Sequence, residues 1–145
     1  MRKIYSDQMK SVLLKSREIA HEMGDSTLCP EHFLLALLCE GDNKTLTLFS
    51  RYIDDIEDFR SKLIQNISNK TKSNILGLPR GAVGLDSEAS LMLKNCVYET
   101  GLNDAAQVLP CHLLLAMLRN HNWPVTRLLM EYGLSYDVAR AFISK

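Results

Sequence analysis

The stretch LCPEHFLLALLC at residues 28–39 recurs as VLPCHLLLAMLR at residues 108–119. At an offset of 80 residues, six of the twelve positions are identical: Pro30/Pro110, His32/His112, Leu34/Leu114, Leu35/Leu115, Ala36/Ala116 and Leu38/Leu118. The same offset carries Tyr52 onto Tyr132 and Arg60 onto Arg140 without a gap. The chain is therefore a tandem duplication of one unit, and this repeated stretch decides its fold.

The repeated stretch is expected to be a central helix. Pro30 suits the first turn of a helix, because its fixed φ fits there and its missing N–H would have no helical partner. Glu31 lies at the positive end of the helix dipole, which favours a carboxylate. Residues 30–40 are apolar on nearly all sides, so other helices must surround them. We therefore expect residues 30–40 and 110–120 to form the core of the two copies.

The flanking segments show helical periodicity with start and stop signals. Ser6 is expected to cap a first helix and Gly24 to end it in the left-handed conformation. Further helices are expected over residues 45–52, 54–66, 86–100, 124–132 and 135–144, and Gly101 and Gly133 lie where helices should end. The predicted fold class is all-α, with two pseudo-symmetric four-helix repeats, eight helices in total.

The two repeats, about residues 6–66 and 86–144, are expected to be joined by a linker over about residues 69–84. This segment, NKTKSNILGLPRGAVG, contains three glycines and one proline. Its glycines suggest a phosphate loop, but no Lys-Ser or Lys-Thr follows, and Asp86 would repel a phosphate at the next helix start. All 145 residues are predicted to form one domain.

Composition narrows the classes of partner and the compartment. Lys plus Arg and Asp plus Glu each number 17, so no net basic charge attracts nucleic acid. The longest apolar run, residues 33–39, is far shorter than the roughly 20 residues that span a bilayer. The four cysteines match no metal, redox or disulfide pattern and are expected to be reduced thiols. We expect a cytoplasmic protein that binds neither nucleic acid nor membrane.

The candidate catalytic and metal residues have simpler structural explanations. Cys111 and His112 are neighbours on a helix and point about 100° apart, so they do not form a thiolate–imidazole pair. His32 and His112 are repeat-equivalent residues near helix starts, which favours a structural role over a metal pair. A cysteine hydrolase would require Cys29 or Cys111 to be exposed with a low pKa. We predict no catalytic residue and no metal ligand.

One aromatic residue is a candidate for binding. Trp123 is the only tryptophan and precedes Pro124 at a helix start. A tryptophan in this place can serve as an apolar anchor for a ligand or can plug a loop. Both interpretations of Trp123 stay open at this level.

With these residues in view, the sequence resembles the Clp N-terminal domain, the double-repeat module at the front of Clp-type AAA+ unfoldases, most closely the ClpC kind. Gly24 precedes His32 by eight residues, PEHFLLALL at residues 30–38 matches the family's core helix, and PCHLLLAML at residues 110–118 is its second copy. The resemblance covers essentially the whole chain.

The resemblance implies a module that captures unfolded or tagged protein substrates and adaptor proteins. It also implies that a Glu in each repeat holds phosphorylated arginine. Glu31 is the first such position and the candidate contact for phosphoarginine or a peptide, whereas Cys111 stands at the second. Pro30 and Pro110 replace the threonine that is common before that Glu.

The resemblance places ATP chemistry outside this chain. The sequence contains no GxxxxGK[ST] motif, so it predicts no cofactor here, with ATP and Mg bound by the AAA+ domains of a parent protein. The expected assembly partners are that AAA+ ring and a ClpP-like peptidase. The alternative hypothesis is a stand-alone helical adaptor or regulator that docks onto a Clp machine.

Overall fold

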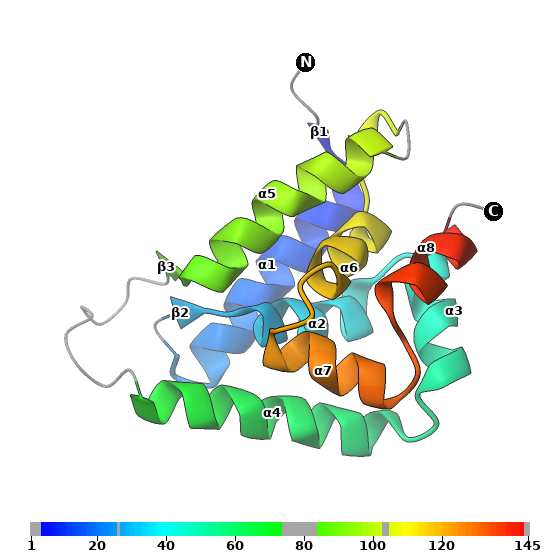
Figure 1. The fold of residues 1–145 in the computed structure, drawn as a ribbon. Helices are drawn as coiled ribbons and strands as arrows, with labels where there is room; N and C mark the ends of the chain where they lie inside the picture. Colours follow the sequence, from blue (N-terminus) through cyan, green and yellow to red (C-terminus); the bar gives the residue numbers. More distant parts are fainter. Residues whose placement is uncertain (1–3, 26, 74–83, 103–104, 144–145) are drawn as a thin grey trace.

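The structure is a computed structural model that describes residues 4–25, 27–73, 84–102 and 105–143, and it is built almost entirely of helices (Figure 1). Repeat one contains β1 (Ile4–Tyr5), α1 (Asp7–Glu22), β2 (Thr27–Leu28), α2 (Pro30–Glu40), α3 (Asn43–Tyr52) and α4 (Ile56–Ser73). Repeat two contains β3 (Gly84–Leu85), α5 (Ser87–Leu102), β4 (Gln107–Val108), α6 (Pro110–Leu118), α7 (Pro124–Glu131) and α8 (Tyr136–Ile143). The predicted fold class, two four-helix repeats, is confirmed.

The helices formed by the repeated stretch, α2 and α6, lie at the centre of the molecule (Figure 1). α2 contacts α1, α3 and α4 of its own repeat and also α5, α6 and α7 of the other. Every residue of α6 is buried, and so is α2 from Pro30 to Leu37. A helix without a polar face can be stable only in such surroundings, so the predicted core helices are confirmed.

Four very short strands tie the repeats together. β1 pairs in parallel with β4, and β2 pairs in parallel with β3. The offset of 80 residues maps one pairing onto the other, so the two are related by the pseudo-twofold symmetry of the duplication. Each repeat thus supplies a strand to the other. Strands of two residues carry no period-2 signal, which is why the sequence did not predict them.

Most helix ends follow their predicted signals. Ser6 Oγ accepts the Met9 N–H at 3.0 Å at the start of α1, and Gly24 after its end has φ 75°. Gly133 after α7 likewise has φ 89°, a value that glycine adopts without strain. Gly101, in contrast, lies inside the last turn of α5 and does not end it.

The fourth helix differs from its prediction at both ends. It begins at Ile56 rather than at residue 54, and Asp55 Oδ1 caps it by accepting the Asp58 N–H at 3.1 Å. α4 also continues through Ser73, into the segment predicted as linker, because the polar residues there carry no helix-breaking glycine or proline before Gly77. The remaining linker residues 74–83 lie outside the described residues.

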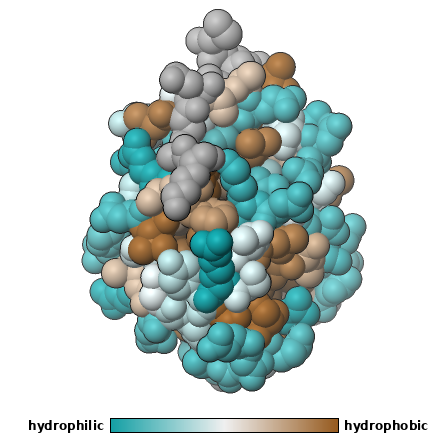
Figure 2. All heavy atoms as spheres, turned by 90° about the vertical axis from the view of Figure 1, so that its right-hand side faces the viewer, coloured by the Kyte–Doolittle hydropathy of each residue, from teal (hydrophilic) through white to brown (hydrophobic). Residues whose placement is uncertain are grey.

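The outer helices pair across the two repeats, α3 with α8 and α4 with α7 (Figure 1). On the face toward α3 and α8, polar side chains divide the apolar surface into separate small patches (Figure 2). Lys44 Nζ of α3 donates to the Ile143 carbonyl at 2.8 Å, and the Arg51 guanidinium lies 4.9 Å from the Phe142 ring centroid. In the part of the chain that the structure describes, no helix is both long and apolar enough to cross a membrane.

Candidate binding site

His32 and His112 hold the starts of α2 and α6 in the same way. His32 Nδ1 accepts the Cys29 backbone N–H at 3.0 Å, and His112 Nδ1 accepts the Leu109 backbone N–H at 2.9 Å. Each histidine occupies the helix position where Glu or Gln usually closes a capping box. The predicted structural role of both histidines is confirmed. Within the described ranges, no group of three His, Cys, Asp or Glu side chains could hold a metal ion.

Repeat one adds a thiol and a carboxylate to this cap. Cys29 Sγ lies 3.3 Å from His32 Nδ1, and Asp25 Oδ2 lies 2.9 Å from His32 Nε2. These are the residue types of a Cys–His–Asp nucleophile. His32 Nδ1 already accepts the Cys29 backbone N–H, however, so its lone pair is not available for the thiol proton, and Cys29 is only 5% exposed. The group therefore fixes the loop before α2.

Cys111 does not meet the conditions for a nucleophile either. Its side chain is 1% exposed, and burial, with a further contribution from Asp42, raises the pKa of the thiol to about 12. A thiol with this pKa stays protonated and unreactive at neutral pH. None of the four cysteines forms a disulfide bond, and Cys39 is the exposed one. The structure therefore gives no support to a cysteine hydrolase.

The two residues that the sequence predicted as ligand contacts are buried. Glu31 is 0% exposed in the first turn of α2. Trp123 is 6% exposed, precedes α7 and belongs to the hydrophobic core. As placed, neither side chain presents an open surface to a ligand, so the binding roles of Glu31 and Trp123 stay predictions.

An open groove lies between α1, α2 and α4, and we call it the repeat-one groove. It encloses about 270 Å³. Its apolar lining is Ile19, Met23, Leu35 and Ile64, and its charged lining is Lys15, Glu22 and Arg60. The exposed thiol of Cys39 completes it, with Sγ 3.9 Å from Arg60 Nη2. The groove thus combines apolar side chains with two cationic side chains and one carboxylate.

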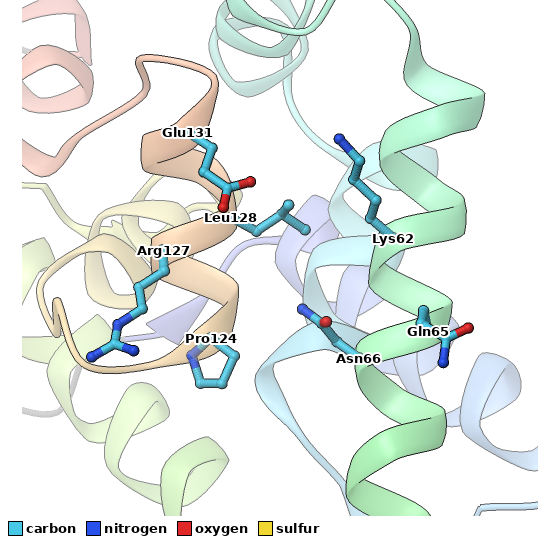
Figure 3. A pocket seen from close by; sticks show the side chains of 7 residues that line it. All are labelled: Lys62, Gln65, Asn66, Pro124, Arg127, Leu128 and Glu131. Atoms are coloured by element: carbon cyan, nitrogen blue, oxygen red, sulfur yellow. The ribbon is translucent and has the colours of Figure 1, made fainter.

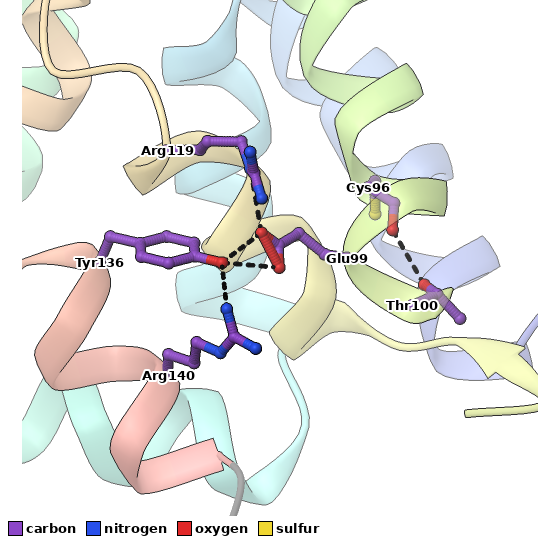
Figure 4. A network of polar contacts seen from close by, with 6 residues as sticks. All are labelled: Cys96, Glu99, Thr100, Arg119, Tyr136 and Arg140. Carbon is purple, nitrogen blue, oxygen red and sulfur yellow. Dashed lines mark hydrogen bonds and ion pairs between the residues drawn. The ribbon is translucent and has the colours of Figure 1, made fainter. Parts of the chain in front are cut away.

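The corresponding place in repeat two is occupied by a polar network (Figure 4). Glu99 of α5 is 0% exposed and accepts hydrogen bonds from Arg119 Nε at 3.1 Å and Tyr136 Oη at 2.5 Å. Arg140 Nη1 also contacts Tyr136 Oη, at 3.3 Å. The Arg119 guanidinium lies 4.7 Å from the ring centroid of Tyr98. Burial, followed by the hydrogen bond with Glu99, raises the pKa of Tyr136, so its hydroxyl remains a donor at neutral pH.

Comparison of the repeats position by position explains the difference between these two places. The offset of 80 residues pairs Ile19 with Glu99, Cys39 with Arg119, Ile56 with Tyr136 and Arg60 with Arg140. Repeat one has kept the arginine and has an aliphatic residue or a thiol at the other three positions. These residues are not conspicuous in the sequence. Their signal lies in the alignment of the two repeats, where Glu99, Arg119 and Tyr136 of repeat two stand opposite aliphatic residues or a thiol in repeat one.

A second groove lies between α4 and α7, at the junction of the two repeats (Figure 3). It encloses about 370 Å³. Its lining is more polar, with Lys62, Gln65 and Asn66 from α4 facing Pro124, Arg127, Leu128 and Glu131 from α7. Lys62 is already engaged, since its Nζ contacts Asp58 at 3.3 Å and Tyr132 Oη at 3.0 Å. This groove has fewer apolar residues in its lining than the repeat-one groove.

Together, the duplicated four-helix repeats and the strand pairs that join them define a helical double-repeat domain, and no catalytic group is assembled among the described residues. The chain belongs to the family of the Clp repeat (R) N-terminal domain, whose sequence pattern matches residues 4–132. No curated protein matches the chain.

Solved structures show the same fold at low sequence identity. The Hsp104 N-terminal domain from Candida albicans is 22% identical, with a TM-score of 0.71 over 97% of this chain and 89% of that one. The N-terminal domain of the ClpV1 ATPase from Escherichia coli is 20% identical, with a TM-score of 0.71 over 94% and 82%. The N-terminal domain of the chaperone ClpD from Arabidopsis thaliana is 12% identical, with a TM-score of 0.60 over 95% and 90%.

Proposed function

We propose that this chain is the substrate- and adaptor-binding N-terminal module of an ATP-dependent Clp-type unfoldase. The observation that carries the proposal is the repeat-one groove in a chain of the Clp N-terminal family. Apolar side chains flanked by charged groups suit the binding of exposed protein segments, which present apolar residues in a polar backbone.

The structural neighbours support the same context. They are N-terminal domains of Hsp104, of the ClpV1 ATPase and of ClpD, a chaperone named as associated with the caseinolytic protease. By analogy, ATP and Mg would bind in AAA+ domains of a parent ring, and a ClpP-like peptidase would be a further partner. We also propose that the protein is cytoplasmic, as the cysteine pattern led us to expect. The proposal further includes that the domain is of the ClpC type.

Binding of an unfolded protein tests the proposal. Fluorescein-labelled, reduced and carboxymethylated α-lactalbumin should raise its fluorescence anisotropy on titration with this chain and saturate in the micromolar range. The native, disulfide-bonded form of the same protein is the matched control and should not bind. Equal binding of both forms, or of neither up to millimolar concentration, would contradict the proposal.

Phosphoarginine recognition is a separate proposal that depends on Glu31. Its carboxylate would pair with the guanidinium, but the side chain is 0% exposed and must turn outward to do so. Titration of phosphoarginine into this chain and into the Glu31→Ala variant measures the effect. The proposal requires binding that the variant loses, and equal binding by both proteins excludes it.

A further inference from the structure

We infer that the repeat-one groove binds a partner segment in which an aromatic side chain stands next to Asp or Glu. In this inference the ring enters between Ile19, Leu35 and Ile64, and the acidic side chain pairs with Arg60. The inference rests on the proposed function and specifies the chemistry of the protein segment that this groove selects.

Repeat two contains an internal template for this ligand. At the equivalent place, the ring of Tyr136 and the carboxylate of Glu99 fill the space between α5, α6 and α8 (Figure 4). The guanidinium of Arg119 contacts both, at 3.1 Å from Glu99 Oε1 and 5.6 Å from the Tyr136 ring centroid. Because the backbone of the two repeats is related by the same offset, a ring and a carboxylate supplied from outside would fit repeat one.

The groove has the size for this pair of side chains. Its volume of about 270 Å³ is below the roughly 300–1,000 Å³ of pockets that enclose a drug-sized ligand. It therefore suits one ring and its immediate neighbour. Ile56 replaces Tyr136 and Ile19 replaces Glu99, so neither of these two positions supplies the ring or the carboxylate in repeat one.

The charges of the groove favour an acidic neighbour. Arg60 contacts only the Cys39 thiol, a weak acceptor, at 3.9 Å, and pairs with no carboxylate of the described residues. Its repeat partner Arg140 donates to Tyr136 Oη. Lys15 and Glu22 also line the groove, but Lys15 pairs with Glu18 at 3.8 Å, so Arg60 is the cation of the lining that no carboxylate of the described residues neutralises. A carboxylate would satisfy Arg60, whereas a purely aliphatic segment would leave it without an acceptor.

Labelled peptides of defined sequence test the inference. The fluorescein-labelled peptide Gly-Ser-Gly-Glu-Tyr-Glu-Gly-Ser-Gly should bind with saturable anisotropy. Versions with Lys for both Glu, or Ala for Tyr, should bind at least about tenfold more weakly, which corresponds to about 1.4 kcal/mol. Arg60→Glu should cause a loss of the same size. Arg17→Glu reverses an exposed charge on the opposite face of α1 and should leave the affinity unchanged.

A gain of the repeat-two network offers a second test. The triple change Ile19→Glu, Cys39→Arg and Ile56→Tyr should fill the groove from within and abolish peptide binding, with folding checked by circular dichroism.

The rate of cysteine alkylation in the unmodified protein is an independent measurement of binding, because Cys39 is the exposed cysteine. Bound peptide should slow the alkylation of Cys39 by N-ethylmaleimide.

The outcomes separate the inference from the proposed function. Equal affinity for the Glu and Lys peptides, no effect of Arg60→Glu, or unchanged alkylation of Cys39 would each overturn the inference. If unfolded α-lactalbumin still binds in that case, the proposed function stands without it. If neither the peptide nor the unfolded protein binds, both are wrong.

Discussion

The two repeats have the same arrangement of helices and strands, but their outer surfaces differ in the grooves that they form. Both open their central helix with a proline and a capping histidine, at Pro30 and His32 or at Pro110 and His112. Both also begin their first helix with a side-chain cap and a strand contact to the other repeat. In repeat two, buried Glu99 and its partners close the space that repeat one leaves open.

This difference shows which positions a duplicated domain is free to change. A residue that caps a helix or fills the central core affects the stability of the whole fold, because the strand pairs β1–β4 and β2–β3 join the repeats. A residue that faces an outer groove acts only locally. Repeat two fills this place with internal contacts, and repeat one has an open, largely apolar groove beside Arg60, where we propose that a partner binds.

We expect the largest effect from substitutions in the two core helices. They test whether both repeats contribute equally to the free energy of unfolding. Leu34 and Leu114 are repeat partners, both 0% exposed at the centre of the molecule. Leu34→Ala and Leu114→Ala should each lower the free energy of unfolding by about 2–5 kcal/mol. Urea unfolding followed by circular dichroism should show one transition for each variant, since the strand pairs couple the repeats. Leu14→Ala, at a 63% exposed position, is the control and should change stability by less than about 0.5 kcal/mol.

Two separate transitions, of which each variant shifts only one, would contradict this prediction. They would mean that the repeats unfold independently and that the parallel strand pairs contribute little to their coupling. A single transition with unequal losses would instead show that one core helix relaxes around the cavity better than the other.

The polar network of repeat two should give the next largest effect. Glu99→Gln keeps the shape but removes the charge that Arg119 and Tyr136 contact, so it should cost about 1.5–3 kcal/mol. Because the Arg119 side chain is 36% exposed, we expect the lower part of this range. Urea titration at neutral pH measures the loss.

A matched variant gives repeat two the residues of repeat one at the three positions of the network that differ. Glu99→Ile, Arg119→Cys and Tyr136→Ile together should cost less than Glu99→Gln alone, because the single variant leaves a buried amide facing donors, whereas the triple variant leaves no buried polar group at these positions. The triple variant should also gain a second peptide site, visible as two bound peptides per chain in calorimetry. A larger loss than in the single variant would show that the network is required for folding.

The fold could be predicted from the sequence because its signals are repeated. The prolines, the caps and the all-apolar helix each occur twice at the same offset, and each has a local physical cause. The strands could not be predicted, since two residues have no period and their partners lie in the other repeat. α4 ran beyond its predicted end because a polar helix turn resembles a polar linker in composition.

The candidate site was harder to predict than the fold. The sequence drew attention to Glu31 and Trp123, which are chemically conspicuous, but burial depends on tertiary packing that composition does not reveal. The groove residues Ile19 and Arg60 are ordinary in sequence. They acquire meaning only when the structure brings α1, α2 and α4 together and shows what fills the same place in repeat two.

Removal of the equivalent helix cap should destabilise the protein equally in the two repeats. We expect this loss of stability to be smaller than that in the polar network. Ser6 Oγ accepts the Met9 N–H at 3.0 Å, and Asp86 Oδ1 accepts the Ala89 N–H at 2.7 Å. Ser6→Ala and Asp86→Ala should each lower stability by about 1 kcal/mol. Ser11→Ala, at an exposed position within α1, should cause no loss, because alanine favours the helix interior. Thermal unfolding of the three variants makes the comparison, and a Ser6→Ala curve equal to that of Ser11→Ala would contradict it.

The smallest expected effect is a loss of stability at acidic pH that is due to His112. Substitution of each capping histidine distinguishes His112 from His32. Burial lowers the pKa of His112 below its ordinary value of 6.5, although Asp42 and Glu99 oppose this shift. Its Nδ1 must also stay unprotonated to accept the Leu109 N–H. Below pH 6.5 the unfolded chain takes up a proton at His112 before the folded chain does, so this residue makes the fold less stable as the pH falls. Above that range both states are neutral there, and the contribution disappears.

Glutamine can close the same cap without titrating, so His112→Gln should match the parent protein at pH 8 and be more stable than it at pH 5. His32→Gln is the repeat-matched control. Asp25 Oδ2 lies 2.9 Å from His32 Nε2, and Ala105 stands in its place in repeat two, so the control loses a contact that His112 does not have. It should therefore be less stable than the parent already at pH 8. Urea midpoints at the two pH values distinguish the variants, and parallel pH profiles for His112→Gln and the parent would assign the acid sensitivity to other groups.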